Sequence, residues 1–258
     1  MTKISAIPRL TFAQLIRMGL AVAFVIGLSN SAALAETAED PRGEAIMARI
    51  TERASAFEES YLGSFSRRTV ETRILDGDDG KLKMTRHAVV DVWDYHGETP
   101  TNEVRDCKID ERVEDPSECV EKRRLEPAYR LFDKDAQKHY RLEYLGVETW
   151  NETPSYRVRV VPRENTPRHL KGDVFFDVQS LRLVGMNITL ADYPFGLKDL
   201  SVELNFADQD GLPVIAGGRS EAHIYVPFLI NDRSITHFTA SDQRLLTEHR
   251  SAAVSEGG

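Results

Sequence analysis

Histidines are the residues of this chain that could bind a metal or act as general bases, and there are seven of them. They are His87, His96, His139, His169, His223, His237 and His249. No two follow the HxH or HExxH spacing that places a pair of imidazoles at one site. No GxSxG nucleophile elbow, P-loop or GxGxxG motif is present. The sequence therefore favours a protein that is not an enzyme and needs no metal or cofactor, and a hydrolase whose groups meet only after folding stays as an alternative.

Two cysteines, Cys107 and Cys119, enclose the polar segment CKIDERVEDPSEC. A redox CxxC motif needs two intervening residues, and a zinc site needs further thiols or imidazoles at ligand spacing. In an exported protein such a close pair forms a disulfide, so we predict a Cys107–Cys119 bridge. Closing a loop of this size stabilises a fold by about 3 kcal/mol. Because the enclosed residues are polar and include Pro116, we expect the bridge to hold an exposed loop.

The N-terminal residues have the parts of a secretory signal peptide. Basic residues precede the apolar run MGLAVAFVIGL, and Ala33 and Ala35 stand where a signal peptidase selects small side chains. The run is roughly a dozen residues long, whereas a membrane-spanning helix needs about 20. We therefore predict a signal peptide over residues 1–35, cleaved after Ala35, and a location in the periplasm of a Gram-negative bacterium. The residue directly after this site is Glu36 and not Cys, so no lipid anchor is expected.

The chain is acidic, with a formal net charge of −8. Loss of Lys3, Arg9 and Arg17 with the signal peptide would bring the charge to about −11. Nucleic acid is excluded as the main partner, because phosphate contacts need clustered Lys and Arg. The same balance argues against broad adhesion to anionic lipid headgroups. The two locally basic stretches, EKRRLEP and RENTPRHLK, are expected at strand ends or in loops.

The first element that must position side chains is a helix. After a flexible leader over residues 36–43, the stretch GEAIMARITERASAFEESY carries apolar residues at helical spacing, with Glu and Arg between them. The apolar residues are Ala45, Ile46, Ile50, Ala54 and Phe57. An amphipathic helix of this kind must cover its apolar face with another layer of the fold.

Beyond the helix the apolar residues alternate with polar ones, which is typical of strands with one buried and one solvated face. The pattern is clearest in DLSVELNF, and turn signals such as GDDG and ADQDG separate such stretches. The sequence predicts roughly nine to eleven antiparallel strands in chain order. Residues 247–258 are expected to form a disordered tail.

A twisted meander of this length must curl. The predicted fold is mainly β (α+β): a curved antiparallel sheet that forms an open half β-barrel, with the N-terminal helix across its concave face. No internal repeat and no domain boundary is visible. Residues 44–246 are therefore expected to form a single domain, and the protein is expected to be a monomer.

The block YRLEYLGVETWNETPSYRVRVVPR, followed by KGDVFFDVQSLRLVGM, resembles the periplasmic lipoprotein-carrier superfamily. That superfamily includes the carrier LolA, the receptor LolB and the N-terminal domain of the regulator RseB. The shared pattern is an aromatic strand with Gly and Glu, a Y-x-V-x-V-x-P strand and a G-x-V-x-x-D hairpin. Here it is carried by Tyr144, Gly146, Glu148, Tyr156, Val158, Val160, Pro162, Gly172, Val174 and Asp177. Two features depart from it: Ser66 and Arg67 follow Phe65 where carriers show Thr-Gln, and the cysteine segment is an insertion.

The resemblance implies an incomplete barrel whose apolar cavity holds acyl chains and is gated by the helix. It implies a non-catalytic periplasmic carrier that binds lipid or lipoprotein acyl chains for outer-membrane lipoprotein sorting or lipid transfer. The candidate cavity residues are Val158, Val160, Val174, Phe176, Leu200, Val202, Leu204 and Phe206. The alternative is that these residues pack on the helix as a closed core.

Two predicted connections, ADYPFGLKD and YVPFLIND, carry apolar residues beside Pro and Gly. The candidate rim residues are Tyr193, Phe195, Leu197, Phe228 and Leu229. They form either an entrance for a lipid or partner, or loop tips that fold back onto the barrel. A membrane acceptor or an envelope protein is the expected further partner. The alternative function is an envelope sensor that binds a protein through a sheet edge or this rim, without lipid cargo.

Overall fold

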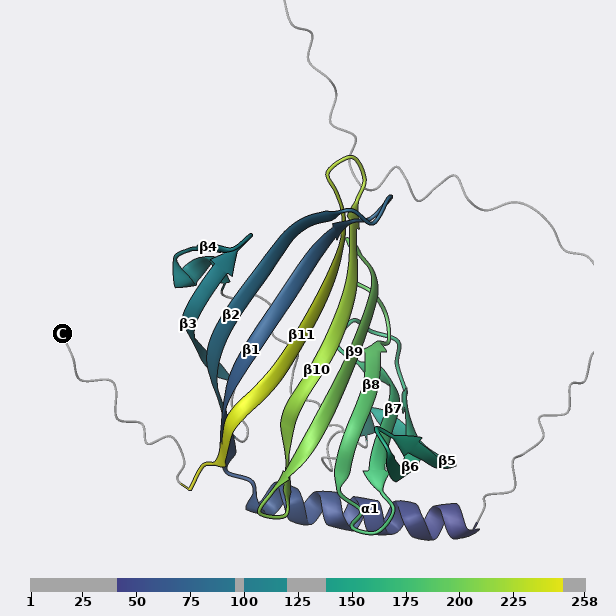
Figure 1. The fold of residues 1–258 in the computed structure, drawn as a ribbon. Coiled ribbons are helices and arrows are strands. Elements are labelled where there is room, and N and C mark those ends of the chain that lie inside the picture. The colour runs from purple at the N-terminus through teal and green to yellow at the C-terminus, as the bar shows by residue number, and fades with distance from the viewer. Residues whose placement is uncertain (1–40, 96–99, 120–137, 248–258) are drawn as a thin grey trace, which may run out of the picture. The chain divides into compact units, whose positions relative to one another are not determined.

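The computed structural model describes residues 41–95, 100–119 and 138–247. All of them belong to one compact unit. The predicted signal peptide, most of the predicted leader and most of the predicted tail lie outside the described residues. Figure 1 shows an α-helix beside a strongly curved sheet.

The helix α1 spans Pro41–Ser60 and begins inside the segment that the sequence assigns to a leader. Its apolar face contacts the sheet through Ile46, Met47, Ile50 and Ala54, and Ile50 is completely buried. The expectation that Ala45 shares this face is wrong, because Ala45 is exposed and the buried stripe follows Ile46 and Ile50 instead. In the described part of the chain, no helix is long and apolar enough to cross a membrane.

Eleven strands form the sheet. They are β1 Gly63–Asp76, β2 Leu82–Tyr95, β3 Thr101–Ile109, β4 Arg112–Val113, β5 Tyr140–Trp150, β6 Thr153–Pro162, β7 Leu170–Asp177, β8 Leu183–Leu190, β9 Leu197–Gln209, β10 Leu212–Val226 and β11 Ile230–Leu245. One turn of 3-10 helix, η1 Pro116–Cys119, follows β4.

The strands are ordered β4-β3-β2-β1-β11-β10-β9-β8-β7-β6-β5, and every neighbouring pair is antiparallel. The first strand therefore pairs with the last, so β1 and β11 lie inside the sheet while β4 and β5 form its edges. The two edges do not pair with each other, and the barrel is open. The predicted fold class, a curved and open antiparallel sheet with one helix, is confirmed.

The convex face is less solvated than the alternation predicts. Phe175 is buried there under the indole of Trp150, with 4.2 Å between the ring centroids. The Nε1 of Trp150 donates to Asn205 on β9, so this side chain reaches across three strands. Gly185 on β8 makes room for it, since a Cβ at that position would lie 2.0 Å from the indole nitrogen. The expectation that one face of the sheet is fully solvated is therefore wrong around Trp150 and Phe175.

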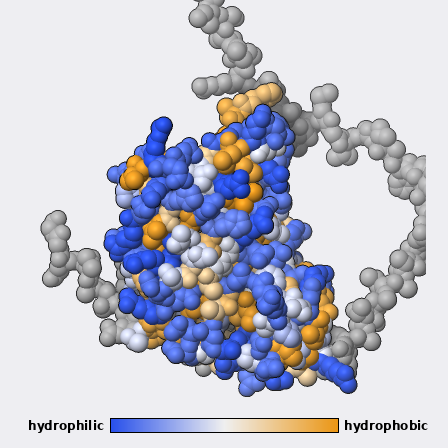
Figure 2. All heavy atoms as spheres, in the orientation of Figure 1, coloured by the Kyte–Doolittle hydropathy of each residue, from blue (hydrophilic) through white to orange (hydrophobic). Residues whose placement is uncertain are grey.

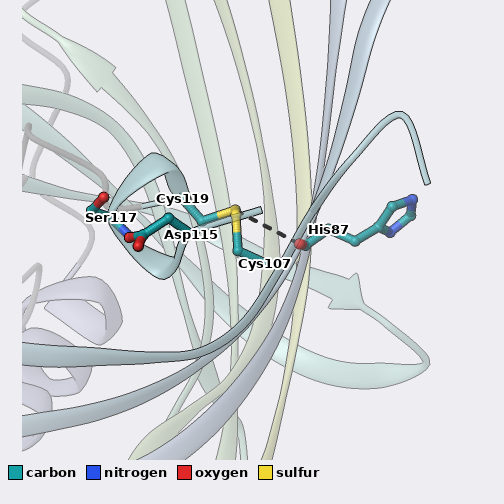
Figure 3. Close-up of a disulfide and its surroundings, with 5 residues drawn as sticks. All are labelled: His87, Cys107, Asp115, Ser117 and Cys119. Carbon is teal, nitrogen blue, oxygen red and sulfur yellow. Dashed lines mark hydrogen bonds between the residues drawn. A yellow bond between two sulfur atoms is a disulfide. The ribbon is translucent and has the colours of Figure 1, made fainter. Parts of the chain in front are cut away.

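The predicted disulfide is confirmed, and Figure 3 shows Cys107 of β3 bonded to Cys119 of η1. The residues between them are mostly exposed, as expected, but they form a short β3–β4 hairpin and η1 where a loop was expected, and the bridge itself is buried against Ala88. The Sγ of Cys119 lies 3.8 Å from the carbonyl oxygen of His87, which is a packing contact because a bridged sulfur carries no proton. Asp115 caps η1 by accepting from the Ser117 N–H, and hydrogen bonds from Ser117 lower the pKa of Asp115.

Candidate ligand-binding cavity

The concave face is divided into two halves that are filled differently. On the half formed by β6–β9, α1 inserts Ile50 among Val158, Val174 and Met186, and all four side chains are completely buried. Figure 1 shows α1 crossing one end of the sheet on this side. This half is a closed hydrophobic core.

A cavity of about 340 Å³, partly open to solvent, lies beyond that core and extends over the other half of the concave face. Strands β1, β2, β3, β7, β8, β9, β10 and β11 contribute to its wall, and none of the described residues of α1 does. Its apolar lining residues are Val70, Ala88, Val90, Val92, Val104, Cys119, Leu170, Ile188, Leu200, Val202, Leu204, Ile215 and Phe238. The single helix is therefore too small to cover the whole apolar face of the sheet.

One row of polar side chains crosses the cavity wall. Arg86 on β2 lies opposite Thr72 on β1, Thr72 lies opposite Thr236 on β11, and Thr236 lies opposite Ser220 on β10. All four line the cavity. The hydroxyls of Thr72 and Thr236 are hydrogen-bonded at 3.0 Å. We call these four residues the polar row.

Arg86 differs from the other arginines of the sheet. Its Nε is buried, and within the described ranges it has no hydrogen-bond partner. Arg67 and Arg105, in contrast, both donate to the carboxylate of Asp91 on the convex face. A buried donor without an acceptor carries a desolvation penalty, so Arg86 presents an unsatisfied group at the cavity wall.

A second cation, Arg68, lies at the end of the cavity nearest α1, together with the carboxylate of Asp94. Arg68 lies over the ring of Phe238, 5.3 Å from its centroid, and donates to Ser66. Asp94 lines the same end and accepts from the Tyr61 hydroxyl. Burial and then the charge of Asp94 raise the pKa of Tyr61. Positive and negative charge are both present here, unlike at Arg86.

The structure separates the predicted cavity residues into three groups. Val158, Val160, Val174 and Phe176 lie in the core under α1. Leu200, Val202 and Leu204 line the cavity. Phe206 packs on the core and lines a cleft of about 20 Å³ beside Phe57 and Tyr61, which has room for about one water. Ligand contact by any of these residues stays a prediction.

The predicted rim residues lie at the end of the sheet opposite α1. Phe195, Phe228 and Leu229 are 89%, 106% and 80% exposed, while Leu197 is half-buried. Their two loops are adjacent, because the N–H of Tyr225 donates to the carbonyl of Gly196. Tyr193 is held back, since its hydroxyl contacts Thr189 and donates to Asp199. We call Phe195, Phe228 and Leu229 the apolar tip; Figure 2 shows hydrophobic residues at the end where the β10–β11 hairpin lies.

Sequence reasoning missed the polar row and the walls from β1, β2, β3, β8, β10 and β11. The alternation in KLKMTRHAVVDVWDY already places Arg86 on the same side as Ala88 and Val90. A cation on an otherwise apolar face was therefore the feature of the sequence that could have identified Arg86 as a site residue. The positions of Thr72 and Thr236 beside Arg86 depend on strand register, which no local pattern reveals. In the part of the chain that the structure describes, no group of three or more His, Cys, Asp or Glu side chains is placed to bind a metal.

No protein-family model matches the sequence, and no curated protein matches it in sequence. In structure the chain is similar to an outer membrane lipoprotein-sorting protein domain from Vibrio parahaemolyticus, with 15% identity and a TM-score of 0.42 over 77% of this chain and 92% of that one. It is similar to a LolA superfamily protein from Nitrosomonas europaea, with 14% identity and a TM-score of 0.33 over 78% and 94%.

The chain is also similar to MucB of Pseudomonas aeruginosa, solved together with MucA, at 8% identity and a TM-score of 0.24 over 78% and 99% of the two chains. At identities and TM-scores this low, the similarity says nothing about function, and the cavity is the feature that bears on it. The LolA superfamily, which the sequence resembles, is named among these structural neighbours.

Proposed function

We propose that this protein is a periplasmic, non-catalytic carrier that binds a hydrophobic ligand in the concave cavity. Its role would be lipid transfer or the sorting of outer-membrane lipoproteins. The observation that supports the proposal is the uncovered half of the concave face, where apolar side chains from eight strands surround about 340 Å³ of space. The predicted signal peptide and the buried disulfide fit an oxidising compartment.

The magnitudes suit a carrier that must also release its cargo. Each buried CH₂ group contributes about 0.8 kcal/mol, so a dozen of them supply about 10 kcal/mol. Association costs roughly 4 kcal/mol or more in lost freedom of motion. The remaining free energy of about 6 kcal/mol corresponds to a dissociation constant of tens of micromolar, which allows an acyl chain to be both held and released.

Native mass spectrometry of protein purified from the periplasm tests the proposal. We expect co-purifying acyl species with the wild-type chain and much less with Val90→Phe, which places a larger side chain in the cavity wall. Val89→Phe is the matched control, because the neighbouring residue points to the convex face. Protein that is folded yet free of lipid, in the wild type as in Val90→Phe, would contradict a carrier.

The second candidate function is an envelope protein-binding module. Two surfaces favour it: the apolar tip, and the edge strand β5, where Leu145 and Val147 are 43% and 61% exposed. An edge strand offers unpaired backbone groups to a partner. Affinity capture of one envelope protein by lipid-free wild type, lost in Phe228→Ser or Val147→Lys, would select this function. Turnover of a panel of simple esters by the same preparation would select the hydrolase alternative.

A further inference from the structure

We propose that the ligand of the concave cavity is a single-chain amphiphile with an anionic headgroup, carboxylate or phosphate, bound at the polar row with Arg86 as its cation. The inference rests on the proposed function, because it assumes that the cavity takes a hydrophobic ligand. It adds the chemistry of the headgroup and the residues that contact it.

The polar row is set between apolar neighbours on the same face. Toward α1, the adjacent positions are Val70, Ala88 and Phe238. Toward the apolar tip, they include Ile74 and Met84. A chain that lies along these apolar positions can place its polar end at this row, and the other cation of the β1–β2 wall is Arg68, which lies opposite Val90.

The donors of the polar row fit an anion. In the pair formed by Thr72 and Thr236, one hydroxyl donates to the other, so one hydroxyl proton stays available. Ser220 adds a second hydroxyl on the next strand. Arg86 and Thr72 stand on neighbouring strands, about 4.8 Å apart, so the guanidinium and an adjacent hydroxyl can donate to one oxyanion. Charge-assisted hydrogen bonds of this kind are the strong ones.

Arg86 supplies the positive charge that has no counterpart among the described side chains. The buried Nε without an acceptor is destabilising as it stands. A carboxylate or phosphate oxygen would satisfy it, so part of the binding free energy comes from removing this penalty. Arg68 is less suited to bind an anionic headgroup, because the carboxylate of Asp94 lines the same end of the cavity and repels an anion.

The size of the cavity favours one chain. A volume of about 340 Å³ lies at the lower end of the range of small-molecule pockets, about 300 to 1,000 Å³. A ligand with several acyl chains would exceed the space that the described residues enclose. The fitting class is therefore a fatty-acid-like or lysophospholipid-like anion.

Three probes with the same sixteen-carbon chain test the inference on the delipidated full-length protein. They are palmitate, 1-palmitoyl lysophosphatidate and the uncharged hexadecanol, with dissociation constants measured by titration. We expect at least one of the two anions to bind about 10- to 100-fold more tightly than hexadecanol, which is the range for a hydrogen bond to a charged group. Arg86→Met should remove this preference and leave hexadecanol binding unchanged, and the better anion identifies the headgroup.

Arg73→Met is the matched control, since Arg73 is an exposed arginine on β1 that faces the convex side. It should bind all three probes as the wild type does. Equal binding of anions and alcohol by the wild type would overturn the inference and leave the carrier intact, whereas failure of all three probes would overturn the carrier itself. An anion preference that survives in Arg86→Met would remove Arg86 from the site. If Arg86→Met does not fold, Arg86→Lys takes its place as a variant that keeps the charge. The preference of the wild type for an anion over hexadecanol still decides whether the headgroup is anionic.

Discussion

At the scale of single residues, Asp91 is a buried charge on the face of the sheet opposite the cavity. It lies between Val90 and Val92, which both line the cavity, but its own side chain points to the opposite face and is 2% exposed. The carboxylate accepts two hydrogen bonds from Arg67 and one from Arg105, at 2.7 to 3.0 Å. These donors, Arg67 first, lower the pKa of Asp91 to about 2.

Asp91→Asn should lower the free energy of unfolding by about 1.5–3 kcal/mol near pH 7, because charge-assisted hydrogen bonds to two guanidinium groups are lost. The folded-state pKa is depressed, so the contribution is present above the unfolded-state pKa of about 4 and disappears as the pH falls toward 2. Urea unfolding at pH 7 and at pH 3 measures this. The difference in the free energy of unfolding between variant and wild type should be smaller at pH 3.

Asp79→Asn is the control for this series, because the Asp79–Lys81 pair is exposed and should contribute less than about 1 kcal/mol. A gap between Asp91→Asn and the wild type that is the same at both pH values would show that the ion pairs of Asp91 do not stabilise the fold.

At the scale of elements, α1 packs on the sheet through Ile46, Met47, Ile50 and Ala54, and Ile50 is the most buried of the four. Ile50 is completely buried among Val158, Val174 and Met186. Ile50→Ala should lower the free energy of unfolding by about 2–5 kcal/mol, since it removes buried methyl groups and leaves a cavity. Thermal unfolding followed by circular dichroism measures this, with Arg49→Ala on the exposed face as control. An Ile50→Ala protein as stable as the control would mean that α1 does not contribute to the core.

The disulfide connects η1 to the sheet at the cavity wall. It closes a sequence separation of 12 residues, and Cys119 lines the cavity. Reduction should lower the free energy of unfolding by about 3 kcal/mol, because the unfolded chain gains freedom. Unfolding curves with and without a reductant test this, and the double variant Cys107→Ala/Cys119→Ala should not respond to the reductant. A wild-type curve that the reductant leaves in place would contradict a stabilising bridge.

At the scale of the whole molecule, the open sheet has one half covered by α1 and one half exposed as a cavity. The resemblance to carriers implies that the helix gates the cavity, but no described residue of α1 lines it. We therefore expect ligand entry to be independent of helix movement. The test is to hold the helix in place and measure loading.

The pair Gly43→Cys/Tyr144→Cys would hold it, because a Cβ at Gly43 lies 3.5 Å from the Cβ of Tyr144, which is within the range for a disulfide. The oxidised variant should take up palmitate or hexadecanol at the same rate and affinity as the same variant after reduction of the new bridge. Slower or weaker loading only in the oxidised form would show that α1 is the gate after all.

Much of the fold follows from patterns that are local in the chain. Turn residues such as Asp210 and Gly211 mark where a hairpin reverses, and both have positive φ in the structure. The alternation in DLSVELNF places Leu200, Val202 and Leu204 on the concave face, where they lie. The candidate site was predicted only in part for the same reason: local patterns identify the face of a residue but not its neighbours on other strands.

The sequence by itself determined the helix, most of the strands, the face of the alternating strand side chains and the Cys107–Cys119 pair, because these depend on residues close to one another in the chain. Only the tertiary structure decided that β1 pairs with β11, which aligns Thr72 with Thr236 and Arg86. It also decided that α1 covers Val158 and its neighbours and leaves the other half open. Both outcomes depend on contacts between distant segments, and a pattern with a period of two residues carries no information on which strand or helix will be the partner.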